Sequence, residues 1–408
     1  MKQFAPFAGF AVLLTSLLAM SGSSGQTLES YAGALTRPPL EDQFGFGFNS
    51  PRWLRPGNPY DGWGDEYLPP RPRRPHGPGF APDLIVYNCL GERRPLEAAV
   101  ATLRPFGTLK LIGAGPGCAL VVPLHLDKPL RISGEKDAIL MGPAAGPCMI
   151  VAPGVSVAVA EVRLRSWSDG GDACVVAENA DVSLERMAVE TRGTAIVARG
   201  GRLSIRDVRL IGGPSPVLRL EHSEFGLVRA HVETVGDGAL ILPPPGGIAQ
   251  IDHAEFVAHG RRGVGVSLRA GESPPGARVV LDEVKLDGFV SGIVAGPGSR
   301  AVATHVNVIH ADEVGVEING SGMDLSNSVI DAGAVGVRLT GYVPGAPGDA
   351  PRILDNQIAA RGIAGIYVTD GTPGEARNNS IGVPPGRCIV GFSRSGDFRE
   401  RANLCHPF

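Results

Sequence analysis

A short apolar phrase recurs along the chain between residues 173 and 367. In each copy a small or apolar residue is followed by an aliphatic residue, a variable residue and a second apolar residue. Copies that follow the one at Ala173 begin at Ala195, Val217, Ala239, Gly265, Gly292, Gly315, Gly336 and Gly365. Successive copies are 21 to 29 residues apart. Such spacing indicates a repeat architecture.

A second stretch of alternating apolar and polar residues precedes many copies of the phrase. It is found at residues 184–189, 203–210, 279–286, 303–308 and 353–358. A period of two, broken by Gly, Asp and Pro, predicts short strands and excludes helices, whose apolar period is 3.6 residues. One unit cannot bury its apolar side, but stacked units form a continuous core. The sequence therefore predicts a parallel β-solenoid with an internal aliphatic column of Val266, Ile293, Val316, Val337 and Ile366.

The repeat is clearest in residues 353–358 and 365–368, which read Ile-Leu-Asp-Asn-Gln-Ile and Gly-Ile-Tyr-Val. These segments resemble the Asn-x-Ile and Gly-Ile-x-Val repeats of the pectin-lyase-like superfamily of right-handed parallel β-helices. The resemblance covers roughly residues 118–390 and implies one all-β domain of that fold, which we place at residues 81–408. Because the superfamily holds lyases, hydrolases, epimerases, esterases, adhesins and non-catalytic carriers, the resemblance implies a fold rather than one activity.

The segments before the repeat are expected to differ from it in structure. Residues 1–26 have the pattern of a secretory signal peptide, with Lys2, a short apolar run and small residues at its end. Residues 27–80 are rich in Pro and Gly and are expected to form a disordered linker, with a sugar- or wall-binding arm as the alternative. Residues 95–103 have the apolar spacing of a short helix, which we expect to cap the first turn.

The signal-peptide pattern of residues 1–26 predicts that the protein is exported. The apolar run near the N-terminus is too short to span a bilayer comfortably, and no later stretch approaches about 20 apolar residues. We therefore expect a periplasmic or secreted protein without a transmembrane segment in the mature chain. The chain has 38 basic and 41 acidic residues, so it has no large positive electrostatic field that would favour a nucleic acid as partner.

Six cysteines are expected to form three disulfides, since export makes such bonds chemically reasonable. Cys148 and Cys174 are about one coil apart, and stacked coils lie about 4.8 Å apart, within disulfide reach. The expected partners of the others are Cys89 with Cys118 and Cys388 with Cys405. Zinc is the alternative for paired cysteines, but the chain contains no Cys-x-x-Cys motif. The sequence predicts no metal site and identifies no cofactor.

Stacking turns equal offsets in successive repeats into columns on the surface. The most polar column is expected at a corner and supplies the candidate catalytic residues, which are His259, Asp287, His310 and Asp331. Imidazole beside carboxylate can form an acid and base pair, and Arg262 nearby could bind a substrate carboxylate. The alternative is ordinary solvated side chains at a corner.

Two further columns have predicted roles. The outward positions of the phrase include Val175, Arg219, Ile241, Arg338 and Tyr367. Arg219, Arg338 and Tyr367 are candidates for substrate binding, with a purely structural cross-strand ladder as the alternative. A third column contains Asn327, Asn356 and Asn378, which resemble the internal asparagine ladder of β-helices and are expected to be structural.

Two functions remain open on these observations. The first is an exported enzyme of the lyase, hydrolase or epimerase type that binds or processes a polysaccharide or other cell-envelope glycan. The second is a non-catalytic envelope scaffold or binding β-helix. Asp169 and Asp172 resemble the paired carboxylates of polygalacturonase-like enzymes, but the other motifs of that branch are absent from the sequence, as are those of alginate epimerases and pectate lyases.

Overall fold

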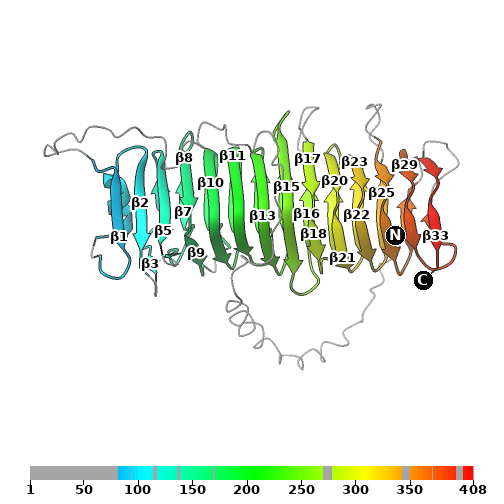
Figure 1. Cartoon of the computed structure of the whole chain (residues 1–408), viewed down its shortest axis with the longest axis horizontal. Coiled ribbons are helices and arrows are strands. Elements are labelled where there is room, and N and C mark those ends of the chain that lie inside the picture. Colours follow the sequence, from blue (N-terminus) through cyan, green and yellow to red (C-terminus); the bar gives the residue numbers. More distant parts are fainter. Residues whose placement is uncertain are drawn as a thin grey trace, which may run out of the picture. The chain divides into compact units, whose positions relative to one another are not determined.

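The structure is a computed structural model that describes residues 81–92, 94–113, 117–135, 138–168, 171–269, 278–341, 350–369, 371–391 and 398–407. The predicted signal peptide and the predicted linker of residues 27–80 lie outside this part of the chain. The described residues form a parallel β-solenoid of about 13 turns. Figure 1 shows its strands following one another along one long axis in sequence order.

Each full turn contributes a strand to each of three faces, and every strand pairs in parallel with its equivalents in the neighbouring turns. Four strands continue round a corner and serve more than one face, namely β10 (Val175–Thr191), β11 (Ile196–Ile211), β13 (Glu224–Thr234) and β15 (Ile248–Ala258). We number the faces in the order in which the chain visits them after the phrase, so that the phrase strands form face 1.

The remaining strands of face 1 are β4 (Leu124–Leu126), β7 (Met149–Val151), β12 (Leu218–Glu221), β14 (Ala239–Leu242), β16 (Val264–Leu268), β19 (Ser291–Ala295), β22 (Val314–Asn319), β25 (Val335–Thr340), β28 (Ala364–Val368) and β31 (Ile389–Val390). Those of face 2 are β1 (Leu84–Asn88), β2 (Gly107–Ile112), β5 (Leu130–Glu135), β8 (Ser156–Ala160), β17 (Arg278–Asp282), β20 (Arg300–Thr304), β23 (Gly322–Ser326), β26 (Arg352–Leu354), β29 (Gly374–Arg377) and β32 (Phe398–Arg401). Those of face 3 are β3 (Cys118–Ala119), β6 (Ile139–Met141), β9 (Arg163–Ser166), β18 (Lys285–Asp287), β21 (Asn307–Ala311), β24 (Val329–Ala332), β27 (Gln357–Ala360), β30 (Ser380–Gly382) and β33 (Leu404–His406).

The predicted aliphatic column is present inside face 1. Its members stand in register from β16 to β28 and are fully buried, in the order Val266, Ile293, Val316, Val337 and Ile366. The glycine that opens the phrase has a steric cause. A Cβ on Gly315 would lie 2.2 Å from Cγ2 of Ile330, so only a glycine lets that face 3 isoleucine pack against the start of β22.

A left-handed residue marks the corner between faces 2 and 3 in almost every turn. The residues with positive φ at this corner are Glu161, Arg186, Asp207, Arg229, His253, Glu283, His305, Asn327, Asp355, Asn378 and Ala402. The predicted strand of residues 279–286 is therefore two strands, β17 and β18, which meet at Glu283. A one-residue kink reverses which side chains point inward, because side chains alternate along a strand.

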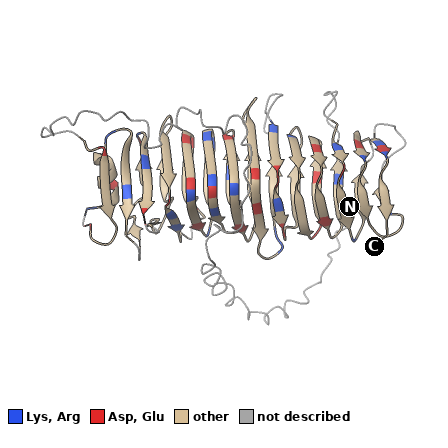
Figure 2. Cartoon of the chain, viewed as in Figure 1, with Lys and Arg blue, Asp and Glu red and all other residues tan. Residues whose placement is uncertain are grey.

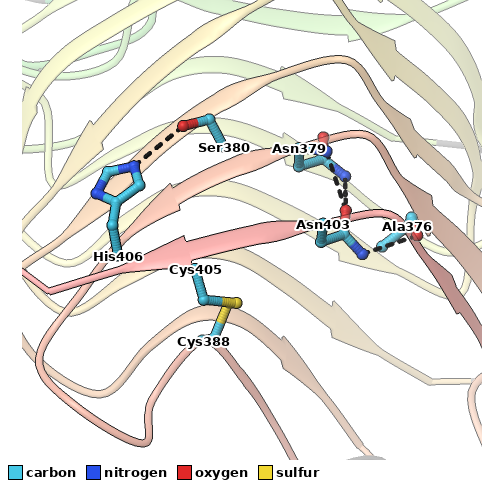
Figure 3. Close-up of a disulfide and its surroundings, with 7 residues drawn as sticks. All are labelled: Ala376, Asn379, Ser380, Cys388, Asn403, Cys405 and His406. Atoms are coloured by element: carbon cyan, nitrogen blue, oxygen red, sulfur yellow. Dashed lines mark hydrogen bonds between the residues drawn. A yellow bond between two sulfur atoms is a disulfide. The ribbon is translucent and has the colours of Figure 1, made fainter.

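The internal asparagine ladder is real, but the sequence placed only one of its members correctly. Asn356, Asn379 and Asn403 occupy one inward column of the C-terminal turns, where Asn356 Nδ2 donates to Asn379 Oδ1 at 3.0 Å. Asn379 Nδ2 in turn donates to Asn403 Oδ1 at 2.9 Å (Figure 3). Asn327 and Asn378 lie instead at the left-handed corner, one position earlier. The prediction missed the extra corner residue and so mixed two columns.

Both ends of the solenoid carry the expected fastenings. Helix α2 (Leu96–Thr102) follows β1 and buries Leu96, Ala99 and Val100 against the core. Cys89–Cys118 ties down the first turns and Cys148–Cys174 joins successive turns. Cys388–Cys405 fastens the last turn (Figure 3), so all three predicted disulfides are confirmed. Within the described residues no helix is long and apolar enough to cross a membrane.

Candidate functional site

Glu233 is the centre of a charged network on face 3, in the middle turns of the solenoid. It is the penultimate residue of β13, and its side chain is only 9% exposed. Arg209 Nη2 lies 2.6 Å and His231 Nε2 lies 3.0 Å from its Oε1, while His259 Nε2 lies 3.2 Å from its Oε2. Three neighbouring turns therefore direct cationic or imidazole groups at one carboxylate.

His231 connects this carboxylate to a second one. Its Nδ1 lies 3.0 Å from Oε2 of Glu255 in β15, and Lys285 Nζ of β18 lies 2.7 Å from Oε1 of the same carboxylate. We call these six residues the Glu233 network: Arg209, His231, Glu233, Glu255, His259 and Lys285. Figure 2 shows acidic and basic residues next to one another on the middle strands.

The network holds its groups in their charged forms. Burial alone lowers the pKa of His231, but hydrogen bonds to Glu233 and Glu255 outweigh it and raise that pKa to about 9. The hydrogen bond from His231, reinforced by Lys285, lowers the pKa of Glu255 to about 2. Burial raises the pKa of Glu233, yet hydrogen bonds from His231 and Arg209 hold it well below its usual range. His231 thus donates through both ring nitrogens, as an imidazolium does.

The four candidate catalytic residues lie along one edge but in separate pairs. His310 Nδ1 contacts Asp287 Oδ1 at 3.0 Å, so the expected contact between an imidazole and a carboxylate is present. His259 contacts Glu233 rather than Asp287. Asp331 Oδ2 pairs with Nη2 of Arg361 at 2.8 Å. The catalytic role of these residues stays a prediction. Of the four, only His310 and Asp287 form an exposed pair, with His310 64% exposed and Asp287 27% exposed.

The candidate substrate-binding residues are spread over two regions. Arg262 is exposed in the segment between β15 and β16. Arg219, Arg338 and Tyr367 point outward from face 1, where Arg219 pairs with Glu221, and Arg338 contacts Glu317 at 3.7 Å. Their column needs one correction, because Val175 and Ile241 are buried.

The outward neighbours Val176 and Leu240 take the places of those two residues in the register of face 1. The prediction counted both positions one residue out of phase. The binding roles of Arg219, Arg262, Arg338 and Tyr367 stay predictions.

Trp167 is a candidate that sequence reasoning did not assign. It follows β9 at the corner between faces 3 and 1, and 47% of its surface is exposed. The guanidinium carbons of Arg165 and Arg192 lie 5.9 Å and 5.6 Å from the centroid of its ring. Arg165 also donates to Glu190 Oε2 at 2.8 Å.

A second pair of histidine and aspartate, His305 and Asp282, matches the pair of His310 and Asp287. His305 lies in the same turn as His310, at the opposite corner of face 3. His305 Nδ1 contacts Asp282 Oδ1 at 3.1 Å, and the His305 side chain is 59% exposed, so this pair repeats the His310 arrangement where faces 2 and 3 meet.

Asp172 accepts a hydrogen bond from the backbone of Gly146, and Asp169 lies outside the described residues. In the part of the chain that the structure describes, no group of three or more His, Cys, Asp or Glu residues is arranged to hold a metal ion.

The sequence contains a signal for the Glu233 network. His231 and Glu233 are polar residues at alternate positions, on either side of the apolar Val232, and Glu255 follows at nearly one repeat length. Outward polar residues that recur in neighbouring turns are expected to meet. Which of them meet depends on the left-handed residue at the corner between faces 2 and 3, whose position the repeat alone does not predict.

The chain matches no known family in sequence, and no curated protein matches it. Among solved structures it is similar to a variant of the catalytic domain of GH87 alpha-1,3-glucanase in complex with nigerose, with a TM-score of 0.53 and 9% identity over 80% of this chain and 70% of that one. The same domain in another complex with nigerose gives 0.49, again at 9% identity and the same coverage. The Azotobacter vinelandii mannuronan C-5 epimerase AlgE6 A-module gives 0.37, with 14% identity over 74% of this chain and 91% of that one. At such low identity the likeness concerns the fold alone, and the chain has a right-handed parallel β-helix fold, as its repeat predicted.

Proposed function

We propose that this protein is exported and binds a polysaccharide along the edge where face 3 turns toward face 1. The observation that carries the proposal is the Glu233 network together with the neighbouring pair of His310 and Asp287. These side chains come from successive turns of a rigid stack, so they present charged donors and acceptors in a line. A linear ligand with repeating hydroxyl groups can follow such a line and bond to one group after another. Hydrogen bonds from hydroxyl groups to charged side chains are stronger than those to neutral ones.

Analogy of fold points in the same direction. The neighbour with a TM-score of 0.53 is the catalytic domain of an alpha-1,3-glucanase in complex with nigerose. Because one fold can host many functions, this analogy raises the expectation of a glycan ligand without identifying the glycan. The three disulfides support export, since such bonds persist in oxidising compartments. We place the protein in the periplasm or outside the cell, after removal of the signal peptide in residues 1–26.

If the protein also processes its ligand, proton abstraction suits this edge better than hydrolysis does. Glycoside hydrolysis usually needs one protonated carboxyl group as general acid, whereas Glu233 and Glu255 both have lowered pKa values. His310 is exposed and held by Asp287, as a general base would be. We assign it that role in a lyase or epimerase type of reaction, with Arg262 binding the substrate carboxylate and His259 and Asp331 flanking the pair.

The non-catalytic scaffold remains the second candidate because one observation favours it. On face 1, Arg199 contacts Glu178 at 3.0 Å and Glu221 at 3.1 Å, and Arg219 pairs with Glu221 as well. Such an even ladder of ion pairs needs no ligand. It implies that Arg219, and with it Arg338 and Tyr367, stabilises the sheet surface rather than binding a substrate.

The test is a screen of the purified protein against neutral and uronic-acid polysaccharides by affinity electrophoresis. Absorbance of unsaturated products is followed in parallel to detect lyase activity. We expect at least one polysaccharide to retard the wild type, and Lys285→Glu, which reverses a charge in the Glu233 network, to lose most of that retardation. Arg202→Glu is the matched control, because Arg202 forms a similar single pair with Glu224 on face 2. If no polysaccharide retards the wild type, the scaffold is the better account.

A further inference from the structure

We propose that a one-residue bulge in β21 is a positioning device for the candidate base. The bulge places His310 outside the core, where Asp287 fixes the ring proton on Nδ1 and leaves Nε2 to meet a ligand. Asp287 is then a positioning residue that acts through His310. This inference rests on the proposed function, because it names the atom of the same edge that accepts a proton. It is carried by the register of β21, the backbone of His310 and its contact with Asp287.

The bulge interrupts an otherwise regular stack. The register between β21 and β24 shifts by one residue between Val308 and Ala311, so Ile309 and His310 share the one partner position that Asp331 occupies. Of the strand pairs that the structure describes, these two strands are the pair with such a shift. Side chains normally alternate along a strand, but here two consecutive residues lie outside before Ala311 returns to the core. The extra residue therefore keeps His310 out of the core.

The fold does not require a histidine at this position. His310 is left-handed, with a φ of 54°, a conformation that glycine adopts at the least cost. In the preceding turn the register places Gly288, which follows Asp287, opposite His310, and this glycine is left-handed as well. In the following turn β24 runs regularly through Asp331, and none of its residues is left-handed. Two neighbouring turns thus form the same edge without a strained side chain, so we attribute the histidine to function.

Asp287 determines which nitrogen of the His310 ring carries the proton. His310 Nδ1 lies 3.0 Å from Asp287 Oδ1. A carboxylate only accepts hydrogen bonds, so the neutral ring donates from Nδ1 and keeps a lone pair on Nε2. Asp331, opposite the bulge, pairs instead with Arg361, whose Nη2 lies 2.8 Å from its Oδ2. Because most of the His310 side chain is exposed, a ligand can reach Nε2.

This arrangement suits the abstraction of a proton from a bound sugar. The proton moves to Nε2, while the electrons of the broken bond stay on the ligand. The imidazolium that forms is stabilised by the carboxylate of Asp287. A neutral histidine without such a partner mostly carries its proton on Nε2 and would then be unable to accept a second one there. Loss of Asp287 should therefore impair His310 without removing it.

The position of the ring proton can be measured without any ligand. Full-length protein with nitrogen-15-labelled histidine is studied by long-range proton–nitrogen NMR at about pH 8.5, above the ordinary pKa of histidine. His310→Asn identifies the His310 signals. We expect a protonated Nδ1 in the wild type and a protonated Nε2 in Asp287→Ala. Asp282→Ala is the matched control: it should alter His305, whose Nδ1 lies 3.1 Å from Asp282 Oδ1, and leave His310 unchanged.

Strain at the bulge is tested by His310→Gly. Glycine relieves the left-handed backbone and removes only an exposed ion pair, so the urea midpoint of this variant should equal or exceed that of the wild type. Val329→Gly, at an exposed strand position of the next turn, should instead lower the midpoint. A fall for His310→Gly as large as that for Val329→Gly would show that the histidine stabilises the fold, and the bulge would then not be a device for function.

A double-mutant cycle tests whether Asp287 acts through His310. The ligand is a polysaccharide that retards the wild type. Asp287→Ala and His310→Gly should each raise the Kd about tenfold, and the double variant should raise it no further. Asp282→Ala should leave the Kd unchanged. Additive losses, or a Kd for Asp287→Ala equal to that of the wild type, would refute the positioning role.

The two proposals fail in different ways. If the wild type binds a polysaccharide but Asp287→Ala leaves the proton of His310 on Nδ1, the positioning role is wrong and the proposed function stands. If the NMR spectra show the expected protonation but no polysaccharide retards the wild type, the proposed function is wrong, and the role of Nε2 toward a ligand falls with it.

Discussion

Two ladders of polar side chains run along this solenoid, one inside the C-terminal turns and one on the surface of the middle turns. Asn356 and Asn379 are each 1% exposed, and their amides bond to one another and to the backbone. The Glu233 network instead joins charged groups at the surface of face 3. The inner ladder is neutral and uses its bonding capacity internally. The outer one is charged, and its edge reaches exposed side chains.

The difference separates a structural ladder from a candidate site. A buried amide without a partner costs free energy, so every member of the inner ladder is needed for stability. The outer network shifts the pKa values of four members, His231, Glu233, Glu255 and Lys285, as groups in functional sites often do. Ion-pair networks that are only structural can produce similar shifts. Experiments that separate stability from binding are therefore the informative ones.

The largest effect on stability is expected from the inner ladder. Replacing Asn379 with Ala removes the acceptor for Asn356 N and Nδ2 and the donor to Ile353 O and Asn403 Oδ1. We expect a loss of about 2–4 kcal/mol in the free energy of unfolding, measured by chemical denaturation. Asn378→Gly is the control, since Asn378 is exposed and left-handed, and it should cost at most about 1 kcal/mol. Equal losses in the two variants would mean that the inner ladder is not a special element.

A smaller, pH-dependent effect is expected from the outer network. The pKa of His231 is raised from 6.5 to about 9, so its contribution is complete below pH 6.5 and disappears as the pH rises to about 9. The pKa of Glu255 is lowered from 4.5 to about 2, so its contribution is present above pH 4.5 and is lost in more acidic solution. The network should therefore stabilise the fold most between about pH 4.5 and 6.5.

His231→Gln tests this directly. The free energy of unfolding of the wild type should fall by on the order of 1–3 kcal/mol more than that of the variant between pH 6.5 and 9. Denaturation with urea at several pH values within that range measures the difference. Parallel pH profiles for the two proteins would show that His231 is not held as an imidazolium.

The sequence predicted the stack, its inner column and the Cys148–Cys174 disulfide because each depends on a period of about one turn. Val316 stacks on Ile293 regardless of how the chain turns at the other corners, and Cys148 lies beside Cys174 for the same reason. The lateral position of a polar residue depends on more. One left-handed residue at the corner between faces 2 and 3 sent Asn378 outward and Asn379 inward.

The candidate site was predicted less completely for the same physical reason. His310 and Asp287 were expected to lie in neighbouring turns, and they make contact. The contact between His259 and Glu233 does not follow from the number of residues that separate each side chain from the next phrase. The segments between face 3 and the phrase differ in length, so equal distances from the phrase do not give equal positions on face 3. Trp167 was left unassigned because cation–π contacts with Arg165 and Arg192 depend on how that corner folds.

The most direct test of the proposed edge uses two histidines of the same turn. His305 and His310 are both exposed, both left-handed and both paired through Nδ1 with an aspartate of the preceding turn, but they lie at opposite corners of face 3. Asn tolerates the left-handed conformation, so His305→Asn and His310→Asn should have similar unfolding midpoints. The measurement is the Kd of each variant for a polysaccharide that retards the wild type. A site along the edge toward face 1 predicts about tenfold weaker binding for His310→Asn and unchanged binding for His305→Asn. Equal Kd values for the two variants, or a loss confined to His305→Asn, would contradict it.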